Sequence, residues 1–242
     1  MTQAPLPVDE RERLQAQYAE IAVLAGGLAH EIKNPLSTIG LNLELMAEDL
    51  DEAESPRDRR LAQRIDTVRR ECRRLDGILL AFLQFARVGE LHCRRADLNA
   101  EVGEFIEFFA PQAADYGVEI SPHLASDLPA VMIDRALFRQ VLMNLALNAQ
   151  QAMPDGGLLE LQTGQRDGRV FLDLIDSGCG MDPGTHVKMF QTFFSTKPEG
   201  SGLGLPTVRK IVEAHGGTIS CDSEPGRGTR FTISLPPAED AP

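Results

Sequence analysis

The first third of the chain alternates apolar and polar residues with a helical period. From Leu14 to Leu50 the apolar residues recur in steps of three and four, with one additional step of four at Pro35. A second series with the same steps runs from Leu61 to Ala86. Such steps place apolar side chains along one seam of a helix that packs against other helices. The pattern therefore predicts two long amphipathic helices.

The two predicted helices are separated by a short polar stretch, Asp51–Asp58, which we interpret as a loop. Two long helices joined by a short loop form an antiparallel hairpin. A lone hairpin leaves its apolar stripe half covered, and a second copy of the chain would cover it. We therefore predict a homodimer in which two hairpins form a four-helix bundle.

Beyond about Gly89 the pattern changes to short elements of both kinds, without the regular alternation of βαβ units. Intermixed strands and helices favour an α+β fold, here an α/β sandwich. The boundary is expected within residues 88–96, with a helical domain over residues 1–90 and a sandwich domain over residues 91–242. In the second domain we expect helices over residues 97–116, 135–153 and 203–215, and strands over residues 118–124, 131–134, 158–163, 169–175, 218–221 and 230–235.

Composition narrows the class of protein. The 242 residues are 43% hydrophobic and carry a net charge of −12. This charge argues against nonspecific binding to nucleic acid or to an anionic membrane, which needs clustered Lys and Arg. The longest uncharged apolar stretch near the N-terminus, Ile21–Ala29, is far shorter than the ~20 residues of a membrane span. The four cysteines have no metal-binding spacing, so free thiols in a cytoplasmic protein are expected.

His30 lies off the seam of the first predicted helix, so its imidazole is expected at the surface of the bundle. Near neutral pH an unperturbed imidazole is mostly uncharged and nucleophilic. The adjacent Glu31 can fix the ring tautomer or accept a proton. An exposed histidine beside a glutamate is more often an ordinary surface residue. The unusual feature is its context, a His-Glu-x-x-Asn-Pro motif that contains Asn34 and Pro35.

Two stretches of the second domain carry polar residues suited to a nucleotide. Asn144 and Asn148 are four residues apart on one predicted helix, so they share a face. Amide oxygens are hard ligands of the kind that Mg²⁺ prefers, although one or both asparagines could equally well hydrogen-bond the adjoining loop. Asp176 ends a predicted strand, where its carboxylate can accept a hydrogen bond from the exocyclic amine of adenine. Gly178 and Gly180 let the backbone approach a flat ring closely.

Two further stretches are rich in glycine. Gly200, Gly202 and Gly204 open a predicted helix whose backbone N–H groups would bind phosphate. Lys197 adds a positive charge nearby. No strand leads into these glycines, so a Rossmann site is not indicated, and a mobile loop that closes over ATP fits better. The last stretch, Gly226–Thr229, lies between two predicted strands. It could belong to the nucleotide site, but a simple hairpin turn explains it equally well.

The stretch Leu28–Leu36 resembles the H-box of two-component sensor histidine kinases. The later stretches, in their order, resemble the N, G1, F, G2 and G3 boxes of the Bergerat-type ATP-binding domain of that family. The resemblance covers residues 20–236. It implies that His30 is the phosphoacceptor and Glu31 the general base. It also implies that Asn34 orients the water that dephosphorylates a partner response regulator.

In the ATP-binding domain the resemblance implies that Asn148 holds Mg²⁺ with support from Asn144, and that Asp176 binds adenine. Gln140 and Gln151 stand where some members carry an acidic and a basic residue. We expect this difference to affect the rate of phosphoryl transfer more than the type of reaction. The implied nucleotide-binding residues are Asn144, Asn148, Asp176, Gly178, Gly180, Lys197, Gly200, Gly202, Gly204, Leu205 and Thr229.

The function that the resemblance implies is autophosphorylation of His30 by ATP and Mg²⁺ in a homodimer, followed by phosphotransfer to an aspartate of a response regulator. Three alternatives stay open: an ATPase that drives a clamp, a nucleotide-binding scaffold without transfer, and a serine/threonine kinase. The hairpin with its H-box argues against the first and the third. No sensor domain is recognisable, so the input is expected from a separate partner protein, from a domain outside this chain, or from the bundle itself.

Overall fold

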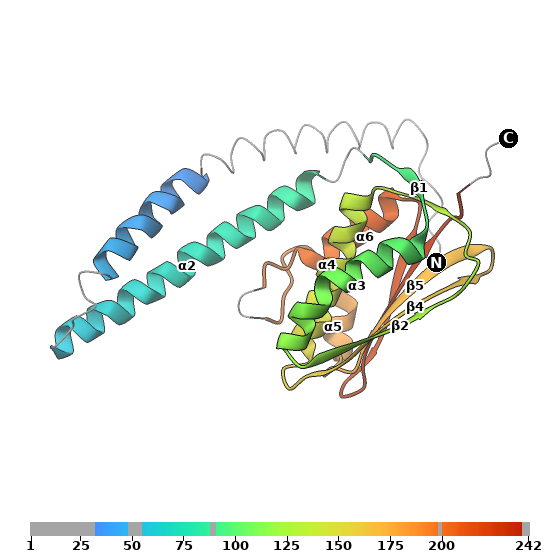
Figure 1. The fold of residues 1–242 in the computed structure, drawn as a ribbon. Helices are drawn as coiled ribbons and strands as arrows, with labels where there is room; N and C mark the ends of the chain where they lie inside the picture. Colours follow the sequence, from blue (N-terminus) through green and yellow to red (C-terminus); the bar gives the residue numbers. More distant parts are fainter. Residues whose placement is uncertain (1–31, 48–54, 88–90, 198–199, 239–242) are drawn as a thin grey trace. The chain divides into compact units, whose positions relative to one another are not determined.

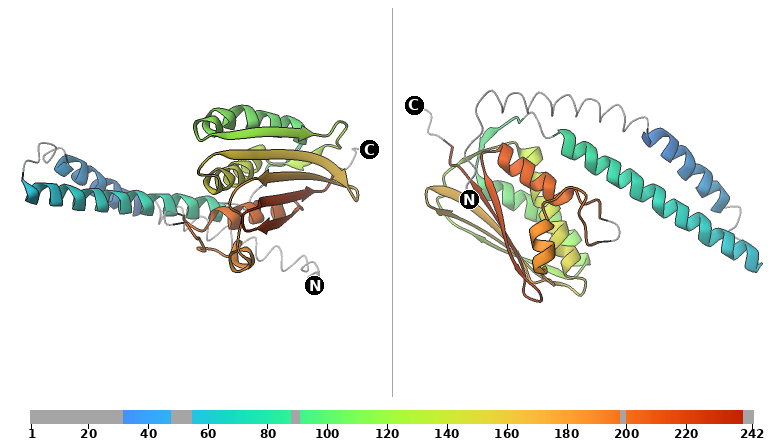
Figure 2. Two further views of the ribbon diagram at one scale, coloured as in Figure 1. Left: turned by 90° about the horizontal axis from the view of Figure 1, so that it is seen from below. Right: turned by 180° about the vertical axis from the view of Figure 1, so that it is seen from behind.

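The computed structural model describes residues 32–47, 55–87, 91–197 and 200–238. They form two compact units, one helical and one built of strands and helices, and each is described by itself (Figures 1 and 2). Within the described ranges, no helix has both the length and the apolar character that a membrane crossing requires. The predicted order of a helical hairpin followed by an α/β sandwich is confirmed.

The helical unit is an antiparallel pair formed by a helix over residues 32–47 and by α2 (Pro56–Arg87) (Figure 1). Helix α2 begins inside the polar stretch that the sequence led us to interpret as loop, so that prediction was wrong at its C-terminal end. The cause is local. The hydroxyl of Ser55 accepts a hydrogen bond from the N–H of Asp58 at 3.2 Å and donates one to its carboxylate at 2.6 Å. This cap, followed by a proline at the first helical position, starts the helix early.

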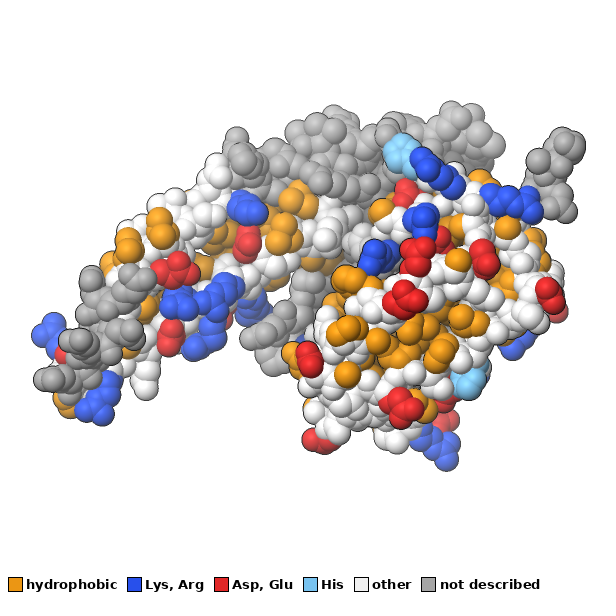
Figure 3. Space-filling view, viewed as in Figure 1, with side chains coloured by type: hydrophobic (Ala, Val, Ile, Leu, Met, Phe, Trp, Pro, Cys, Tyr) orange, Lys and Arg blue, Asp and Glu red, His pale blue; other side chains and the backbone are white. Residues whose placement is uncertain are grey.

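In the described part of the hairpin, the apolar seams are only partly buried. Ile65 and Ala86 are buried, with 6% and 5% of their surface exposed. Figure 3 shows hydrophobic side chains at the surface of this unit. Exposed apolar surface of this extent commonly marks an interface. The large seam side chains that stay exposed include Ile39, Met46, Leu61, Val68 and Leu75.

The second unit is built on a five-stranded sheet with the strand order β2-β4-β5-β7-β6. Strands β2 and β4 pair in parallel, and the other neighbours pair antiparallel. A separate two-stranded sheet joins β1 (Arg94–Ala96) to β3 (Val131–Ile133). The strands of the larger sheet are β2 (Val118–Leu124), β4 (Gly157–Arg166), β5 (Arg169–Asp176), β6 (Thr218–Glu224) and β7 (Gly228–Leu235).

Helices α3, α4 and α6 form one layer against one face of this sheet (Figures 1 and 2). The predicted helices and strands are thus present, with ends that differ by a few residues. The sequence did not predict β1 or the short helix α5, because neither segment contains a run of apolar residues. The helices are α3 (Leu98–Asp115), α4 (Arg135–Ala152), α5 (Pro183–Lys188) and α6 (Gly204–Ala214).

Successive side chains of a strand point to opposite faces of the sheet, so every second residue packs against the helical layer. In β5, Val170, Leu172 and Leu174 are at most 3% exposed. Helix α3 contributes Phe105 and Phe109, whose rings stack with their centroids 5.6 Å apart. Such rings bury a large apolar area, so this layer contributes much of the stability of the unit.

Replacing Phe109 by alanine is expected to lower the free energy of unfolding by about 3–5 kcal/mol, since a buried aromatic ring leaves a cavity. Phe109 is 0% exposed, whereas its neighbour Phe108 is 56% exposed and stacks on the guanidinium of Arg139. The matched variant Phe108→Ala should therefore cost about 1 kcal/mol or less. Chemical denaturation measures both, and equal losses would contradict the packing described here.

Candidate functional site

Asp176 ends β5 on the face of the sheet that carries the helices, in the same alternation as Leu172 and Leu174. The residue is only 6% exposed. Its Oδ1 accepts a hydrogen bond from the N–H of Gly178 at 2.9 Å. A buried carboxylate requires such donors, because its transfer out of water is costly. The turn after β5 therefore holds this carboxylate in place at the end of the core.

Glycines bring the chain close together around Asp176. A Cβ at Gly178 would overlap Ala152 at the end of α4, and a Cβ at Gly180 would overlap the carbonyl of Glu224 in β6. Gly180 also has φ of 65°, a left-handed conformation that favours glycine. The loop after β5 is thus packed between α4 and the β6–β7 turn, where side chains have no room.

Thr229 lies beside Asp176 because the register of β5 and β7 pairs these two residues. Thr229 is 7% exposed, and its hydroxyl lies 3.0 Å from that of Ser223 in β6. The hydroxyl of Ser223 accepts a hydrogen bond from the N–H of Met181 at 2.9 Å. The sequence analysis did not identify Ser223 as a site residue, because the sequence around a single serine does not show which residues lie beside it in the fold. It links the loop after β5 to the β6–β7 hairpin.

Asn144 and Asn148 lie one turn apart on α4, and both are half-buried. The first residue of α6, Gly204, lies next to Asn144. A Cβ placed on Gly204 would be 3.5 Å from Oδ1 of Asn144. Helix α6 packs along α4, so the asparagine face and the start of α6 are adjacent. The structure therefore brings together two of the predicted stretches that lie far apart in the sequence.

The start of α6 is fixed by contacts of its own residues. Leu203 is 1% exposed, and its carbonyl accepts a hydrogen bond from the hydroxyl of Thr207 at 2.7 Å. Leu205 is half-buried in the first turn. Before the helix, the carbonyl of Gly202 accepts from the N–H of Phe193 at 2.9 Å. A Cβ on Gly202 would collide with the backbone of Phe193, so the chain reaches α6 along a path that requires glycine.

Five further predicted site residues lie outside the α/β unit or outside the described residues. Lys197 and Gly200 lie in a segment that does not belong to the compact α/β unit. His30 and Glu31 lie outside the described residues. Asn34 lies in the helix over residues 32–47, where it is exposed.

The groups around Asp176 and α4 fit a nucleotide with Mg²⁺. Mg²⁺ usually takes one or two protein oxygens and completes its shell with water and phosphate. Asn144 and Asn148 can supply amide oxygens of this kind, and the start of α6 beside Asn144 presents N–H groups that suit phosphate. In the described part of the chain, no cluster of three His, Cys, Asp or Glu side chains is placed to hold a metal ion.

The thiols of the described residues are free, as the sequence predicted. Burial, together with the carboxylates of Asp222 and Asp176, raises the pKa of Cys221 to about 12. Cys179, in the loop after β5, is exposed. The Cys221 thiol therefore stays protonated near neutral pH and is a poor nucleophile there.

Both units match known families. Residues 22–91 match the His Kinase A (phospho-acceptor) domain, and residues 133–239 match the histidine kinase-, DNA gyrase B-, and HSP90-like ATPase. The chain is 36% identical to the sensor histidine kinase ZraS of Klebsiella oxytoca, over 94% of this chain and 50% of the relative. It is 32% identical to the signal transduction histidine-protein kinase AtoS of Escherichia coli (strain K12), over 94% of this chain and 37% of the relative. The chain thus spans half or less of the length of these relatives.

Two solved structures resemble the chain over nearly its whole length. The histidine kinase ThkA in complex with the response regulator protein TrrA has a TM-score of 0.67 and 27% identity, covering 95% of this chain and 66% of that one. Full-length ShkA in complex with AMPPNP has a TM-score of 0.68 and 29% identity, covering 90% of this chain and 46% of that one. The likeness therefore includes both the helical and the α/β unit.

Cys221 is expected to react with iodoacetamide far more slowly than Cys179 at about pH 8, because the thiolate is the nucleophile. The raised pKa, about 12, means that the rate at Cys221 should increase only as the pH approaches that value. Peptide mass spectrometry of the native protein after timed alkylation measures both rates. Equal rates at the two thiols would contradict the environment assigned to Cys221.

Proposed function

We propose that this chain, which belongs to the two-component sensor histidine kinases, uses ATP and Mg²⁺ to phosphorylate His30 and passes the phosphoryl group to an aspartate of a response regulator. One observation carries the proposal. The buried carboxylate of Asp176, the asparagine face of α4 and the start of α6 all lie in the unit that matches the ATPase family. The structure of the similar protein ShkA in complex with AMPPNP supports the binding of a nucleotide by this chain.

The adenine is proposed to bind at the end of β5. The carboxylate of Asp176 accepts from the exocyclic amine, and Gly178 and Gly180 let the ring approach the backbone. Thr229 lines the same place, because it pairs with Asp176 in the sheet. A buried charged acceptor discriminates between an amine and a carbonyl oxygen, since the wrong partner leaves it unpaired.

The phosphates are proposed to bind the backbone N–H groups of Gly202, Gly204 and Leu205 at the start of α6, near the positive end of the helix dipole. Lys197 and Gly200 are proposed to contribute from the segment before this helix. When bound, Mg²⁺ would neutralise negative charge on the phosphates. Asn148 is the proposed protein ligand, with Asn144 supporting it from the preceding turn.

In the proposed transfer, one ring nitrogen of His30 attacks the γ-phosphorus while the other nitrogen holds the ring proton. The bond between the γ-phosphorus and the bridging oxygen breaks, ADP leaves, and Glu31 receives the proton released from the imidazole. The product, a phosphoramidate, can pass its phosphoryl group to an aspartate. Asn34, on the exposed surface of the helix over residues 32–47, is proposed to serve dephosphorylation of the response regulator.

Residues 1–90 are proposed to act as the dimerisation and phosphoacceptor domain and residues 91–242 as the ATP-binding domain. The exposed seam side chains of the hairpin support a homodimer, in which a second hairpin would cover them. The complex of ThkA with TrrA supports a response regulator as the partner. A separate input protein is a further proposed partner. The cytoplasm, which supplies ATP and keeps thiols reduced, is the proposed location.

His30→Gln is expected to abolish labelling of the protein by ATP carrying a γ-phosphoryl label. In the wild type, the label should be lost in acid and retained in base, as expected of a phosphoramidate. His123→Gln, which changes a histidine that is exposed on β2, is the matched control and should keep the label.

Label that persists in His30→Gln, or that survives acid but not base, would contradict the assignment. Release of free phosphate without any phosphoprotein would favour the clamp ATPase. Tight ATP binding without labelling would favour the scaffold.

Asp176→Asn is expected to weaken ATP binding by about 10- to 100-fold, since a hydrogen bond to a charged group is worth about 1.5–3 kcal/mol. It should also reduce the preference for ATP over GTP. Asp173→Asn is the matched control, because Asp173 is equally buried on the same strand but bonds Thr232 on the opposite face. Titration calorimetry with each nucleotide measures the affinities. An effect of the same size in both variants would contradict the proposed adenine contact.

A further inference from the structure

A buried polar junction joins the start of α4 to the end of α6. Asp134 and His215 are 8% and 7% exposed. The backbone N–H of Asp134 donates to Nε2 of His215 at 2.9 Å. The other ring nitrogen, Nδ1, lies 2.7 Å from the carbonyl of Ile211 in the last turn of α6. The junction therefore connects two helices through one imidazole.

The hydrogen bonds assign the tautomer of His215. Nε2 faces a backbone donor, so it must carry a lone pair, and the ring proton lies on Nδ1, which donates to Ile211. Both ring nitrogens are thus satisfied only in this neutral form. An apolar side chain at this position would leave the buried N–H of Asp134 without its acceptor, which is costly.

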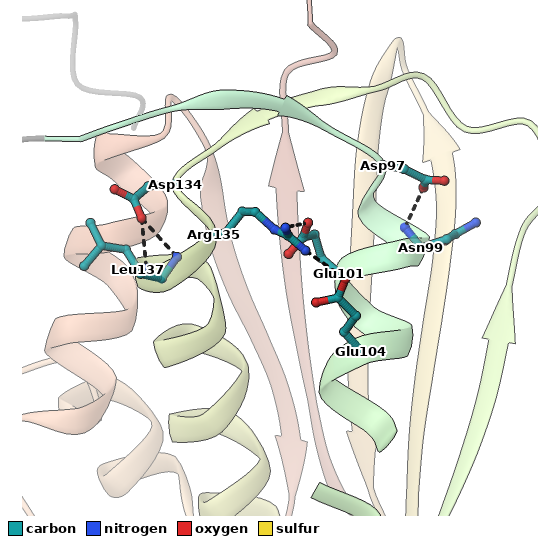
Figure 4. A network of polar contacts seen from close by, with 8 residues as sticks. Asp97, Asn99, Glu101, Glu104, Asp134, Arg135 and Leu137 are labelled. Carbon is teal, nitrogen blue, oxygen red and sulfur yellow. Dashed lines mark hydrogen bonds and ion pairs between the residues drawn. The ribbon is translucent and has the colours of Figure 1, made fainter. Parts of the chain in front are cut away.

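The carboxylate of Asp134 holds the other side of the junction. Its Oδ1 accepts from the N–H groups of Ala136 and Leu137 at 3.0 and 3.2 Å, which caps α4 (Figure 4). Its Oδ2 accepts from the N–H of His92 at 3.0 Å, just before β1. Burial works against the charged form, but these three donors lower the pKa of Asp134 below its usual value. Helix α4 is further tied to α3, because Arg135 pairs with Glu101 at 2.6 Å (Figure 4).

The distance from the junction to the proposed nucleotide site is similar along α4 and along α6. Asn144 lies ten residues after Asp134, and Gly204 lies eleven residues before His215. At the helical rise these separations are about 15 and about 16 Å. Since Gly204 lies beside Asn144, the helices run antiparallel, with contacts at the junction and at the site. A shift at the junction would move Gly204 along α4 by a similar amount, because helices are stiff over this length.

We propose that Asp134 and His215 are positioning residues for ATP, whose hydrogen bond sets the register of α6 against α4 and thereby places the start of α6 beside the asparagine face. The inference rests on the proposed function, because it assigns these residues a role in the same site. It extends that function to a place far from the nucleotide. Through His92, the segment just before β1 is attached to the same carboxylate.

The test compares three variants of the full chain by titration calorimetry with AMPPNP and Mg²⁺. His215→Leu removes the acceptor and is expected to weaken binding about tenfold, in line with couplings carried by packed elements. His215→Gln keeps an acceptor oxygen near the place of Nε2 and should bind within about twofold of the wild type.

Thr163→Val is the matched control for lost stability. Thr163 is a buried polar residue that bonds Asn99 at 2.7 Å and Ala125 at 3.1 Å, four residues along β4 from the partner of Asp176. It should lower stability without changing the affinity. Denaturation curves of all variants give the stabilities, and the titrations are made where each is folded.

The outcomes distinguish a failure of the proposed function from a failure of the inference about Asp134 and His215. If the wild type does not bind AMPPNP, the proposed function is wrong and the inference fails with it. If the wild type binds and His215→Leu binds equally well, only the inference is overturned. It is also overturned if His215→Gln or Thr163→Val weakens binding as much as His215→Leu. Should His215→Leu not fold, His215→Ala takes its place, with weaker binding than His215→Gln expected.

Discussion

The burial of one carboxylate at the end of the central strand is the constraint on which the α/β unit depends. Strand alternation sends the side chains of Leu172, Leu174 and Asp176 to the same face. The two leucines enter the core, but the carboxylate must be hydrogen-bonded because an unpaired buried charge is costly. The turn after β5 supplies one donor from Gly178. The amine of adenine is the further donor that the proposed function assigns to this place.

Around this carboxylate, neighbouring segments pack closely through the backbone of glycine residues. Gly178 and Gly180 allow the loop after β5 to contact α4 and β6, and Gly202 allows the chain to reach α6 beside Phe193. Each contact would be blocked by a single Cβ atom. The glycine-rich stretches are therefore needed for packing as well as for the approach of a nucleotide. Both requirements act on the same positions, which is why the stretches stand out in the sequence.

The sequence was most informative where a period or a motif was present. Helix α2, the strands of the larger sheet and the asparagine face of α4 all followed from spacing. The first predicted helix is confirmed over residues 32–47, and the rest of it lies outside the described residues. The cap at Ser55 began α2 earlier than expected, because one local hydrogen bond outweighed the polar character of the stretch. The contact between Asp134 and His215 joins residues 81 positions apart, so no local pattern could reveal it. The roles assigned to His30 and Glu31 stay predictions, since both lie outside the described residues.

The central claim is that ATP binds in the α/β unit between Asp176 and the start of α6. A crystal structure of the chain with AMPPNP and Mg²⁺ tests it most directly. We expect the exocyclic amine within hydrogen-bonding distance of the Asp176 carboxylate, and the metal bound by the side chain of Asn148 and by the phosphates. A nucleotide bound elsewhere, or in this place with its base turned away from Asp176, would contradict the account.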